Sequence, residues 1–276
     1  MTTLSSAADV LRCLSVDRPF LTVSTAAELL GVPKSTASRL LRAMLEAGFL
    51  ETIGASKKYG PGLLLYEAGR LYRDSSSLIQ RAASVVARIS SDTGHTGYVS
   101  KREGRDVVAV TDHQGTNALR VASSIGRRLE AFASATGRTL LARMSNEDVR
   151  KLYPHPLTPP SPTAPQNIDE LLASLAAVRH RGFAESHDES NRGVGAIAVA
   201  VADPERGDTV SLCIAYPASM IAPPERQQII DALRAGAAEI AAVTRDPGFI
   251  HEPGVSAPAA QDGQAPSLKK RRVARS

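Results

Sequence analysis

The feature that most constrains this chain is a pair of short amphipathic helices, joined by a tight turn, that the sequence predicts within residues 24–48. The first helix is expected to be capped by Ser24 or Thr25, because Thr25 and Glu28 match the T-x-x-E pattern of a capping box. Gly31 is expected to make the turn, since glycine accepts backbone angles that other residues avoid. The apolar residues of the first helix that are expected to pack inward are Ala26, Leu29 and Leu30. Two helices in this arrangement form a helix-turn-helix, which places its second helix in the major groove of DNA.

The second predicted helix has two distinct sides. It is expected to begin at Pro33, whose missing N–H costs little in the first turn, and to end near Gly48. At 100° per residue, one side is apolar and holds Ala37, Leu40, Leu41, Met44 and Leu45. The opposite side carries hydroxyls and arginines without an acid: Ser35, Ser38, Arg39 and Arg42. Because arginine donates in pairs to guanine edges and serine contacts phosphate or base, we expect this side to read DNA, with Lys34 and Thr36 on the phosphates.

An alternative to a DNA-binding helix-turn-helix is an ordinary helical hairpin with a solvated polar face. The residues after the second helix help to distinguish the two. Residues 49–53 predict a strand, residues 54–56 a turn and residues 57–60 a returning strand. A small β-hairpin directly after the second helix is the order found in a winged helix-turn-helix. Lys57 and Lys58 lie near its tip, where they are expected to contact phosphates and add affinity without sequence information.

The N-terminal residues match a known pattern over a long run. Leu21 to Gly48 nearly reproduces L-T-x-S-x-x-A-x-x-x-G-x-P-K-S-T-x-x-R-L-L-x-x-L-x-x-x-G, and Gly60-Pro61 is followed by three leucines. Residues 5–70 therefore resemble the DNA-binding domain of the IclR family of bacterial transcription regulators. The resemblance implies a winged helix-turn-helix on double-stranded operator DNA, a linker helix, and dimers that pair into tetramers.

The net charge of +5 does not by itself predict DNA binding, because residues 268–276 supply all of it. The basic residues of that segment are Lys269, Lys270, Arg271, Arg272 and Arg275. Residues 246–276 are expected to form a disordered basic tail. Such a tail either strengthens nonspecific DNA binding by counterion release or is a solvated, dispensable end.

The cysteine content and the distribution of apolar residues indicate in which cellular compartment the protein is found. The two cysteines, Cys13 and Cys213, are far apart and predict neither a disulfide framework nor a cysteine metal site. No run approaches the ~20 apolar residues that a membrane span needs, and the N-terminus lacks a signal-peptide pattern. We therefore expect a cytoplasmic protein that has no membrane contact.

Helices and strands interleave after the wing, which predicts an α+β domain. Helices are expected at 62–73, 78–89, 132–144, from Asn146 (capped by its own side chain), 168–181 and 223–243. Strands are expected at 96–101, 106–111, 118–123, 194–202 and 208–216, and the six prolines of 154–165 predict a loop. The predicted divisions are a DNA-binding domain at 1–61, a linker helix at 62–74, an effector-binding and oligomerisation domain at 75–245, and the tail at 246–276.

Residues 75–245 resemble the effector-binding domain of the same family, which has a GAF-like α/β fold and binds a small organic molecule, frequently a carboxylate or an aromatic metabolite. The segments that carry the resemblance are 126–129, 133–138, 182–184, 188–189, 193–198 and 214–217. The resemblance implies an effector pocket at Gly126, Arg127, Ala133, Ser134, Gly137, Asp188, Glu189, Gly195, Ala196, Cys213 and Ala215. The chain departs from the family pattern at Arg138, which replaces a lysine, and at Glu130, which replaces a proline.

Two interpretations of these pocket residues stay open. Ala196, Cys213 and Ala215 stand where relatives carry polar residues, which favours an effector less polar than a two-carbon oxoacid, yet the same residues suit ordinary core packing. Glycines at 126, 137 and 195 either present N–H groups to an anionic head group or serve only turns and close helix–strand contacts.

Catalytic constellations are not evident in the sequence. Residues 193–198 match the dinucleotide fingerprint with a final alanine, but they open a predicted strand rather than a helix. His187, Asp188 and Glu189 are consecutive in a predicted loop and cannot all turn toward one metal ion. We therefore predict no enzyme activity, no cofactor and no metal, and a transcription regulator controlled by a small effector. The alternatives are an architectural DNA-binding protein whose C-terminal domain only oligomerises, and an enzyme with a fused winged domain.

Overall fold

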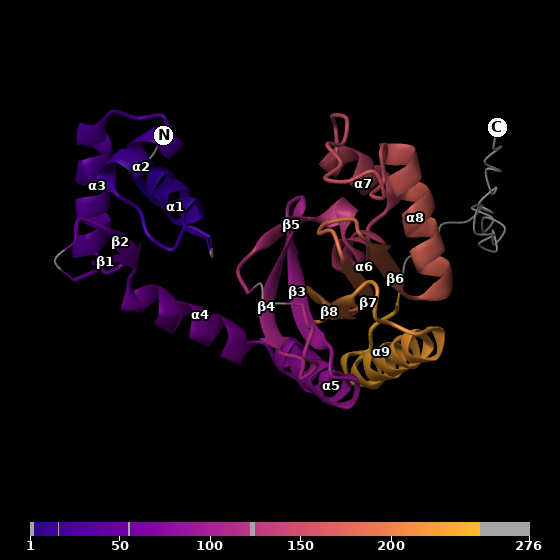
Figure 1. Ribbon diagram of the computed structural model, residues 1–276. Coiled ribbons are helices and arrows are strands. Elements are labelled where there is room, and N and C mark those ends of the chain that lie inside the picture. Colours follow the sequence, from indigo (N-terminus) through magenta and orange to yellow (C-terminus); the bar gives the residue numbers. More distant parts are fainter. Residues whose placement is uncertain (1–2, 16, 55, 122–124, 249–276) are drawn as a thin grey trace, which may run out of the picture.

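The computed structural model describes residues 3–15, 17–54, 56–121 and 125–248 of the chain. It shows an N-terminal unit and a larger C-terminal unit, connected by one helix that extends between them (Figure 1). The predicted basic tail lies almost entirely outside the described residues. No helix in the described part of the chain is both long and apolar enough to cross a membrane.

The N-terminal unit is a three-helix core followed by a small antiparallel hairpin. Its elements are α1 (Thr3–Cys13), α2 (Val23–Leu30), α3 (Lys34–Glu46), β1 (Leu50–Thr52) and β2 (Tyr59–Pro61). The helices bury Val10, Ala26, Leu41 and Met44 against Leu21 and Leu50. The predicted helix-turn-helix and its hairpin are confirmed, and Gly31 makes the turn with φ +63°.

The start of α2 differs from the prediction. The N-cap is Thr22, whose hydroxyl accepts a hydrogen bond from the Thr25 N–H at 3.1 Å, so the capping box that ends at Glu28 is wrong. Beginning the helix at Val23 buries Ala26 and Ala27 and leaves Leu29 exposed, although Leu29 was expected to pack inward. Several hydroxyl residues compete for the cap in this segment, and burial of the two alanines fixes which one is used.

Helix α4 (Leu63–Ser75) leaves the hairpin and reaches the C-terminal unit (Figure 1). Its start is held close to the end of α3, because the Gly62 N–H donates to the Phe49 carbonyl at 2.9 Å. A side chain at position 62 would place its Cβ 2.3 Å from the Gly48 carbonyl oxygen, so only glycine permits this approach. None of the α4 side chains is buried, and Leu63, Tyr66 and Leu71 are 65%, 66% and 70% exposed.

The C-terminal unit is a six-stranded antiparallel sheet in the order β5-β4-β3-β8-β7-β6. The strands are β3 (Thr96–Glu103), β4 (Asp106–His113), β5 (Arg128–Glu130), β6 (Ala184–His187), β7 (Val194–Asp203) and β8 (Asp208–Pro217). Helices α5 (Ser77–Thr93) and α9 (Pro223–Thr244) cover one face. The other face carries η1 (Ala131–Ala133), α6 (Ala135–Leu141), α7 (Asn146–Leu152) and α8 (Ile168–Arg181) (Figure 1).

The sheet therefore separates two cores. Ile89, Val199 and Leu212 lie in the core under α5 and α9. Phe132, Leu171 and Cys213 lie in the core under α6 and α8. The expected α+β class and GAF-like domain are confirmed.

Several predicted elements of this unit are corrected. Residues 118–121 are not a strand, 122–124 lie outside the described residues, and the short β5 pairs with β4 at the edge of the sheet instead. Strand β6 was not predicted. The helix expected over 132–144 is divided into η1 and α6, and the cap of α7 is Ser145, whose hydroxyl accepts from the Asp148 N–H at 3.1 Å.

Side chains cover the part of β7 that β6 leaves open. Strand β6 pairs with residues 195–198 of β7, and the edge beyond continues to Asp203. There the Ala202 N–H donates to the Asp246 carboxylate at 2.8 Å, and the Ala202 carbonyl accepts from the Thr244 hydroxyl at 2.7 Å. Arg143 forms an ion pair with Asp246. These contacts bind the chain after α9 to the sheet and satisfy backbone groups at an otherwise free edge.

Candidate DNA interface and ligand cavity

The outward side of α3 is the candidate DNA interface. Ala37, Leu41 and Met44 are buried on the inner side of the helix. The polar side is free of the core: Lys34, Ser35, Arg39 and Arg42 are exposed, and Thr36 and Ser38 are half-buried. After α3, Gly48 takes φ +78°, and the Phe49 N–H donates to the Met44 carbonyl at 2.9 Å, as in a Schellman motif.

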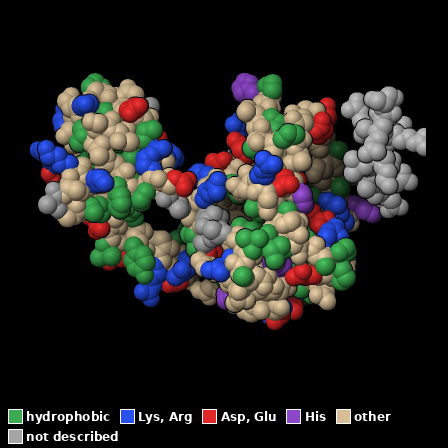
Figure 2. All heavy atoms as spheres, in the orientation of Figure 1, with side chains coloured by type: hydrophobic (Ala, Val, Ile, Leu, Met, Phe, Trp, Pro, Cys, Tyr) green, Lys and Arg blue, Asp and Glu red, His purple; other side chains and the backbone are tan. Residues whose placement is uncertain are grey.

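The cations of this surface are available to an external anion. Among the described residues, no ion pair involves Lys34, Arg39, Arg42, Lys57 or Lys58. Figure 2 shows Lys and Arg side chains at several points on the N-terminal unit. A cation that holds no internal partner can approach phosphate without first breaking an ion pair.

The hairpin after α3 has the form of a wing. Leu50 pairs with Pro61 and Thr52 with Tyr59, and the exposed Lys57 and Lys58 lie near the turn. Leu21, just before α2, bridges Tyr59 through two hydrogen bonds of 2.8 Å. The second strand of the wing is therefore joined to the residue that precedes α2.

A cavity in the C-terminal unit is the candidate ligand site. It lies on the α6 side of the sheet, and its empty volume is about 660 Å³, part of which is open solvent. Its apolar lining is Val107, Ala109, Val121, Leu129, Ala135, Val194, Ala196, Cys213 and Ala215. Its polar lining is Tyr98, Ser100, Arg127, Ser134, Thr136, Ser186, Ser190 and Asn191.

Some of the polar side chains that line the cavity have no partner in the described part of the chain. Among the described residues, no hydrogen bond or ion pair involves the side chains of Ser100, Arg127, Ser186 or Asn191. By contrast, the Ser134 hydroxyl accepts from the Gly137 N–H at 3.0 Å. Ser100 is buried and Ser186 and Asn191 are half-buried, so their unpartnered groups are costly unless water or a ligand meets them, whereas Arg127 is exposed at the edge of the cavity. Four such groups from separate parts of the fold define a polar site in an apolar cavity.

One thiol, that of Cys213, lines the cavity. Burial raises the pKa of the Cys213 thiol to about 11, so it stays protonated near neutral pH. Within the described ranges, no three His, Cys, Asp or Glu side chains are grouped so that they could hold a metal ion.

Comparison with known families assigns both units. The IclR helix-turn-helix domain matches residues 3–54, and the C-terminal domain of the bacterial transcriptional regulator IclR matches residues 71–242. The chain belongs to the IclR family. Members of this family are DNA-binding transcriptional regulators and not enzymes.

Curated IclR relatives and solved IclR structures agree with this assignment. The regulator XynR of Escherichia coli is 29% identical over 182 residues, which are 66% of this chain and 72% of that protein. The regulator KdgR of Escherichia coli is 28% identical over 76% of this chain and 80% of its own length. An IclR regulator from Alicyclobacillus acidocaldarius superposes with a TM-score of 0.79 at 26% identity, covering 88% of this chain and 98% of its own.

An IclR homolog from Microbacterium hydrocarbonoxydans, solved in complex with 4-hydroxybenzoate, shares the fold with a TM-score of 0.73 at 24% identity. The alignment covers 88% of this chain and 99% of that one.

The cavity brings together part of the residue set that the IclR resemblance implied. The predicted residues that line it are Arg127, Ser134, Ala196, Cys213 and Ala215. The others lie outside its lining: Gly126, Ala133, Gly137, Asp188, Glu189 and Gly195. At Gly137 a Cβ would lie 2.1 Å from the Ala131 carbonyl oxygen, and at Gly195 a Cβ would lie 2.3 Å from the Tyr216 ring. These two glycines permit close packing, which is the second of the two roles considered for them.

Sequence reasoning missed the polar residues Ser100, Ser186, Ser190 and Asn191. Ser100 lies two residues after Tyr98 in a predicted strand, so strand periodicity places both on one face, but the pattern does not say which face borders a cavity. Ser186 lies in β6, which was not predicted. The hydroxyl groups of the cavity therefore come from positions other than Ala196, Cys213 and Ala215, the strand positions at which relatives carry polar residues.

Proposed function

We propose that this IclR-family chain is a dimeric regulator whose binding to operator DNA is controlled by a small organic carboxylate or aromatic metabolite in the cavity. The observation that carries the proposal is the set of unpartnered polar side chains in an apolar cavity, with Arg127 as its charged member. A guanidinium beside an apolar space suits a carboxylate attached to a hydrocarbon or ring. Residues 1–61 bind DNA in this proposal, 62–74 link, and 75–245 bind the effector and oligomerise.

DNA recognition is assigned to α3 and the wing. Ser35, Ser38, Arg39 and Arg42 contact base edges in the major groove, because they share the polar side of the helix, where all but the half-buried Ser38 are exposed. The residues that hold the phosphate backbone are Lys34, Thr36, Lys57 and Lys58.

Dimerisation is supported by the exposed apolar residues of the linker helix. At 100° per residue, Leu63, Leu64 and Leu71 share one side of α4, and Tyr66 flanks them; all four are exposed in the single chain. Figure 2 shows hydrophobic side chains along the start of α4. A single reading head buries too little surface for specific binding, and a two-fold operator needs two heads. Pairing of two α4 helices buries the apolar side and fixes the spacing of the heads, and the family resemblance adds pairing of dimers into tetramers.

Effector control then requires coupling between the cavity and the DNA heads. Coupling of this kind amounts to about 1–3 kcal/mol between two binding sites. Because α4 leads directly into α5 under the sheet, a change in the C-terminal unit can alter the angle at which α4 leaves it (Figure 1).

The test is thermal unfolding of the full chain against a panel of small carboxylates and aromatics that includes 4-hydroxybenzoate. A compound that binds only the folded chain at 100 times its Kd stabilises it by about 2.7 kcal/mol, which raises the unfolding midpoint. A mobility-shift titration with operator DNA, with and without that compound, then shows the coupling. Absence of any stabilising compound, together with DNA binding, would favour a C-terminal domain that only oligomerises.

A further inference from the structure

The loop between β6 and β7, residues 188–193, closes one side of the cavity. It contributes Ser190 and Asn191 to the lining, and the strands that flank it contribute Ser186 and Val194. We call residues 188–193 the cavity loop. Its position decides both the size of the cavity and the place of two of its polar side chains.

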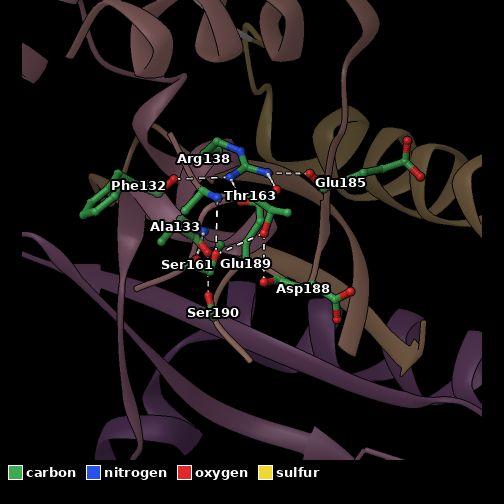
Figure 3. Close-up of polar contacts among 12 residues, drawn as sticks. Phe132, Ala133, Arg138, Ser161, Thr163, Glu185, Asp188, Glu189 and Ser190 are labelled. Atoms are coloured by element: carbon green, nitrogen blue, oxygen red, sulfur yellow. Dashed lines mark hydrogen bonds and ion pairs between the residues drawn. The ribbon is translucent and has the colours of Figure 1, made fainter. Parts of the chain in front are cut away.

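Arg138 on α6 reaches across to the cavity loop and is almost completely buried. Its side chain is 4% exposed and that of Glu189 is 11% exposed. One guanidinium nitrogen donates to the Phe132 carbonyl at 3.2 Å and to one oxygen of Glu189. The other donates to the second Glu189 oxygen at 2.9 Å and to the Glu185 carbonyl (Figure 3). Arg138 thus joins α6, the 3-10 turn η1, strand β6 and the cavity loop.

Hydrogen bonds also attach the cavity loop to the domain, and one of them runs from the Ala218 N–H to the Gly193 carbonyl at 2.9 Å. The Ser190 hydroxyl donates to the Ala133 carbonyl at 2.5 Å, and the Thr163 hydroxyl donates to the Asp188 carbonyl at 2.9 Å (Figure 3). A two-pronged arginine–carboxylate contact is stronger than a neutral hydrogen bond, and removing one member leaves a buried charge without its partner. We therefore expect the Arg138–Glu189 pair to be the strongest of these attachments.

We propose that Arg138 is the positioning residue of the effector cavity: by holding Glu189 it keeps the cavity loop closed and sets Ser190 and Asn191 over the site. The inference rests on the proposed function for its biological meaning, but its physical content concerns the chain without effector. A lysine has one nitrogen and cannot make the two carboxylate contacts and two carbonyl contacts that the planar guanidinium makes together.

The chain contains its own reporter of loop opening. Cys213 is buried and lines the cavity, whereas Cys13 lies in the N-terminal unit and is half-buried. Alkylation by iodoacetamide at pH 8.5, quantified for each cysteine by peptide mass spectrometry, measures access to the cavity at Cys213. Cys13 serves as the reference within the same molecule.

The experiment compares Arg138→Met, Arg138→Lys and Glu189→Gln with the matched control Arg143→Met. The Arg143–Asp246 pair is also a buried arginine–carboxylate pair of the C-terminal unit, but it fastens the β7 edge and does not line the cavity. We expect alkylation of Cys213 to accelerate at least tenfold in Arg138→Met, by a smaller factor in Arg138→Lys, and by less than twofold in Arg143→Met. The rate at Cys13 should stay constant in all variants.

Hydrogen exchange gives a second measurement. The Asp188 N–H donates to the Val194 carbonyl at 3.0 Å, and the Val194 N–H donates to the Asn191 carbonyl at 3.3 Å. Exchange at these amides should rise in the Arg138 variants while α5 and α9 keep their protection. In a double-mutant cycle, Arg138→Met combined with Glu189→Gln should open the loop little more than either change alone.

The inference is overturned if Cys213 reacts no faster in either Arg138 variant, or if Arg143→Met accelerates it equally. If Arg138→Met does not fold, the rates of Cys213 alkylation in Arg138→Lys and Glu189→Gln provide the same test. Because no effector is added, the outcome is separate from the ligand panel, whose failure would count against the proposed function alone.

Discussion

Gly62, where the wing meets the linker helix, should be unable to accept even a methyl group. An alanine Cβ there would lie 2.3 Å from the Gly48 carbonyl oxygen and 3.0 Å from the Phe49 carbonyl carbon. Side-chain Cβ atoms essentially never come closer than 3.0 Å to another heavy atom, so backbone must move by about 0.7 Å. The φ of Gly62 is −80°, which alanine adopts freely, so the cost is steric and not conformational.

Overpacking of this kind costs about 1–3 kcal/mol. In a domain of 60–100 residues, 1 kcal/mol lowers the unfolding midpoint by roughly 4–8 °C. We therefore expect Gly62→Ala to lower the midpoint of the N-terminal unit by at least roughly 4 °C and to weaken operator binding, because it shifts the start of α4 relative to α3. Differential scanning calorimetry and operator titration measure the two effects.

Gly69 in the same helix provides the matched control. A Cβ at Gly69 meets nothing within 4 Å, and the residue lies inside α4. Gly69→Ala should therefore stabilise the helix by up to about 1 kcal/mol, since glycine is a poor helix former. The steric argument would be refuted if the two substitutions moved the midpoint in the same direction, or if Gly62→Ala left it unchanged.

Three further predictions concern the two sites. Arg39→Ala should weaken operator binding by ~1–3 kcal/mol and relax preference at one base pair, and an unchanged footprint and affinity in a binding-site selection would exclude its role. Arg127→Ala should abolish the stabilisation produced by carboxylate ligands in the thermal panel and spare that produced by neutral aromatic ones; equal losses would contradict a carboxylate contact. The Cys213 thiol, whose pKa is raised from 9.0 to about 11 by burial, contributes stability below pH 9 that is lost as the pH rises toward 11. The free-energy difference between wild type and Cys213→Ala should shrink by about 2 kcal/mol over that range in urea unfolding, and a constant difference would exclude the shift.

The elements best predicted from the sequence are those in which the local helix signals and the pattern of burial agree. In α3, the apolar residues Ala37, Leu41 and Met44 are buried and the arginines are exposed, as the helical period predicts, whereas Leu40 and Leu45 of the predicted apolar side are half-buried. Helix α8 has the predicted bounds because Asn167 caps it and Gly182 ends it with φ +81°. In such segments local propensity and tertiary burial agree.

The rest depended on contacts between distant residues. Strand β5 has three residues, and its pairing with β4 follows from the return of the chain to that edge, which no local pattern contains. The glycines at 137 and 195 carry the same sequence signal whether they serve a ligand or a neighbouring ring. The roles of Ser100 and Ser186 follow from the cavity between the sheet and α6, which exists only once those elements are assembled.

The side chains that cover the β7 edge limit how far the C-terminal end of the domain can be shortened. Thr244 and Asp246 act there in place of a neighbouring strand, since they satisfy the carbonyl and N–H of Ala202. Without them an open, apolar strand edge would face solvent, and open edges promote pairing with the same edge of another molecule. The last residue of α9 and Asp246 thus cover a strand edge that would otherwise be open to pairing with another molecule.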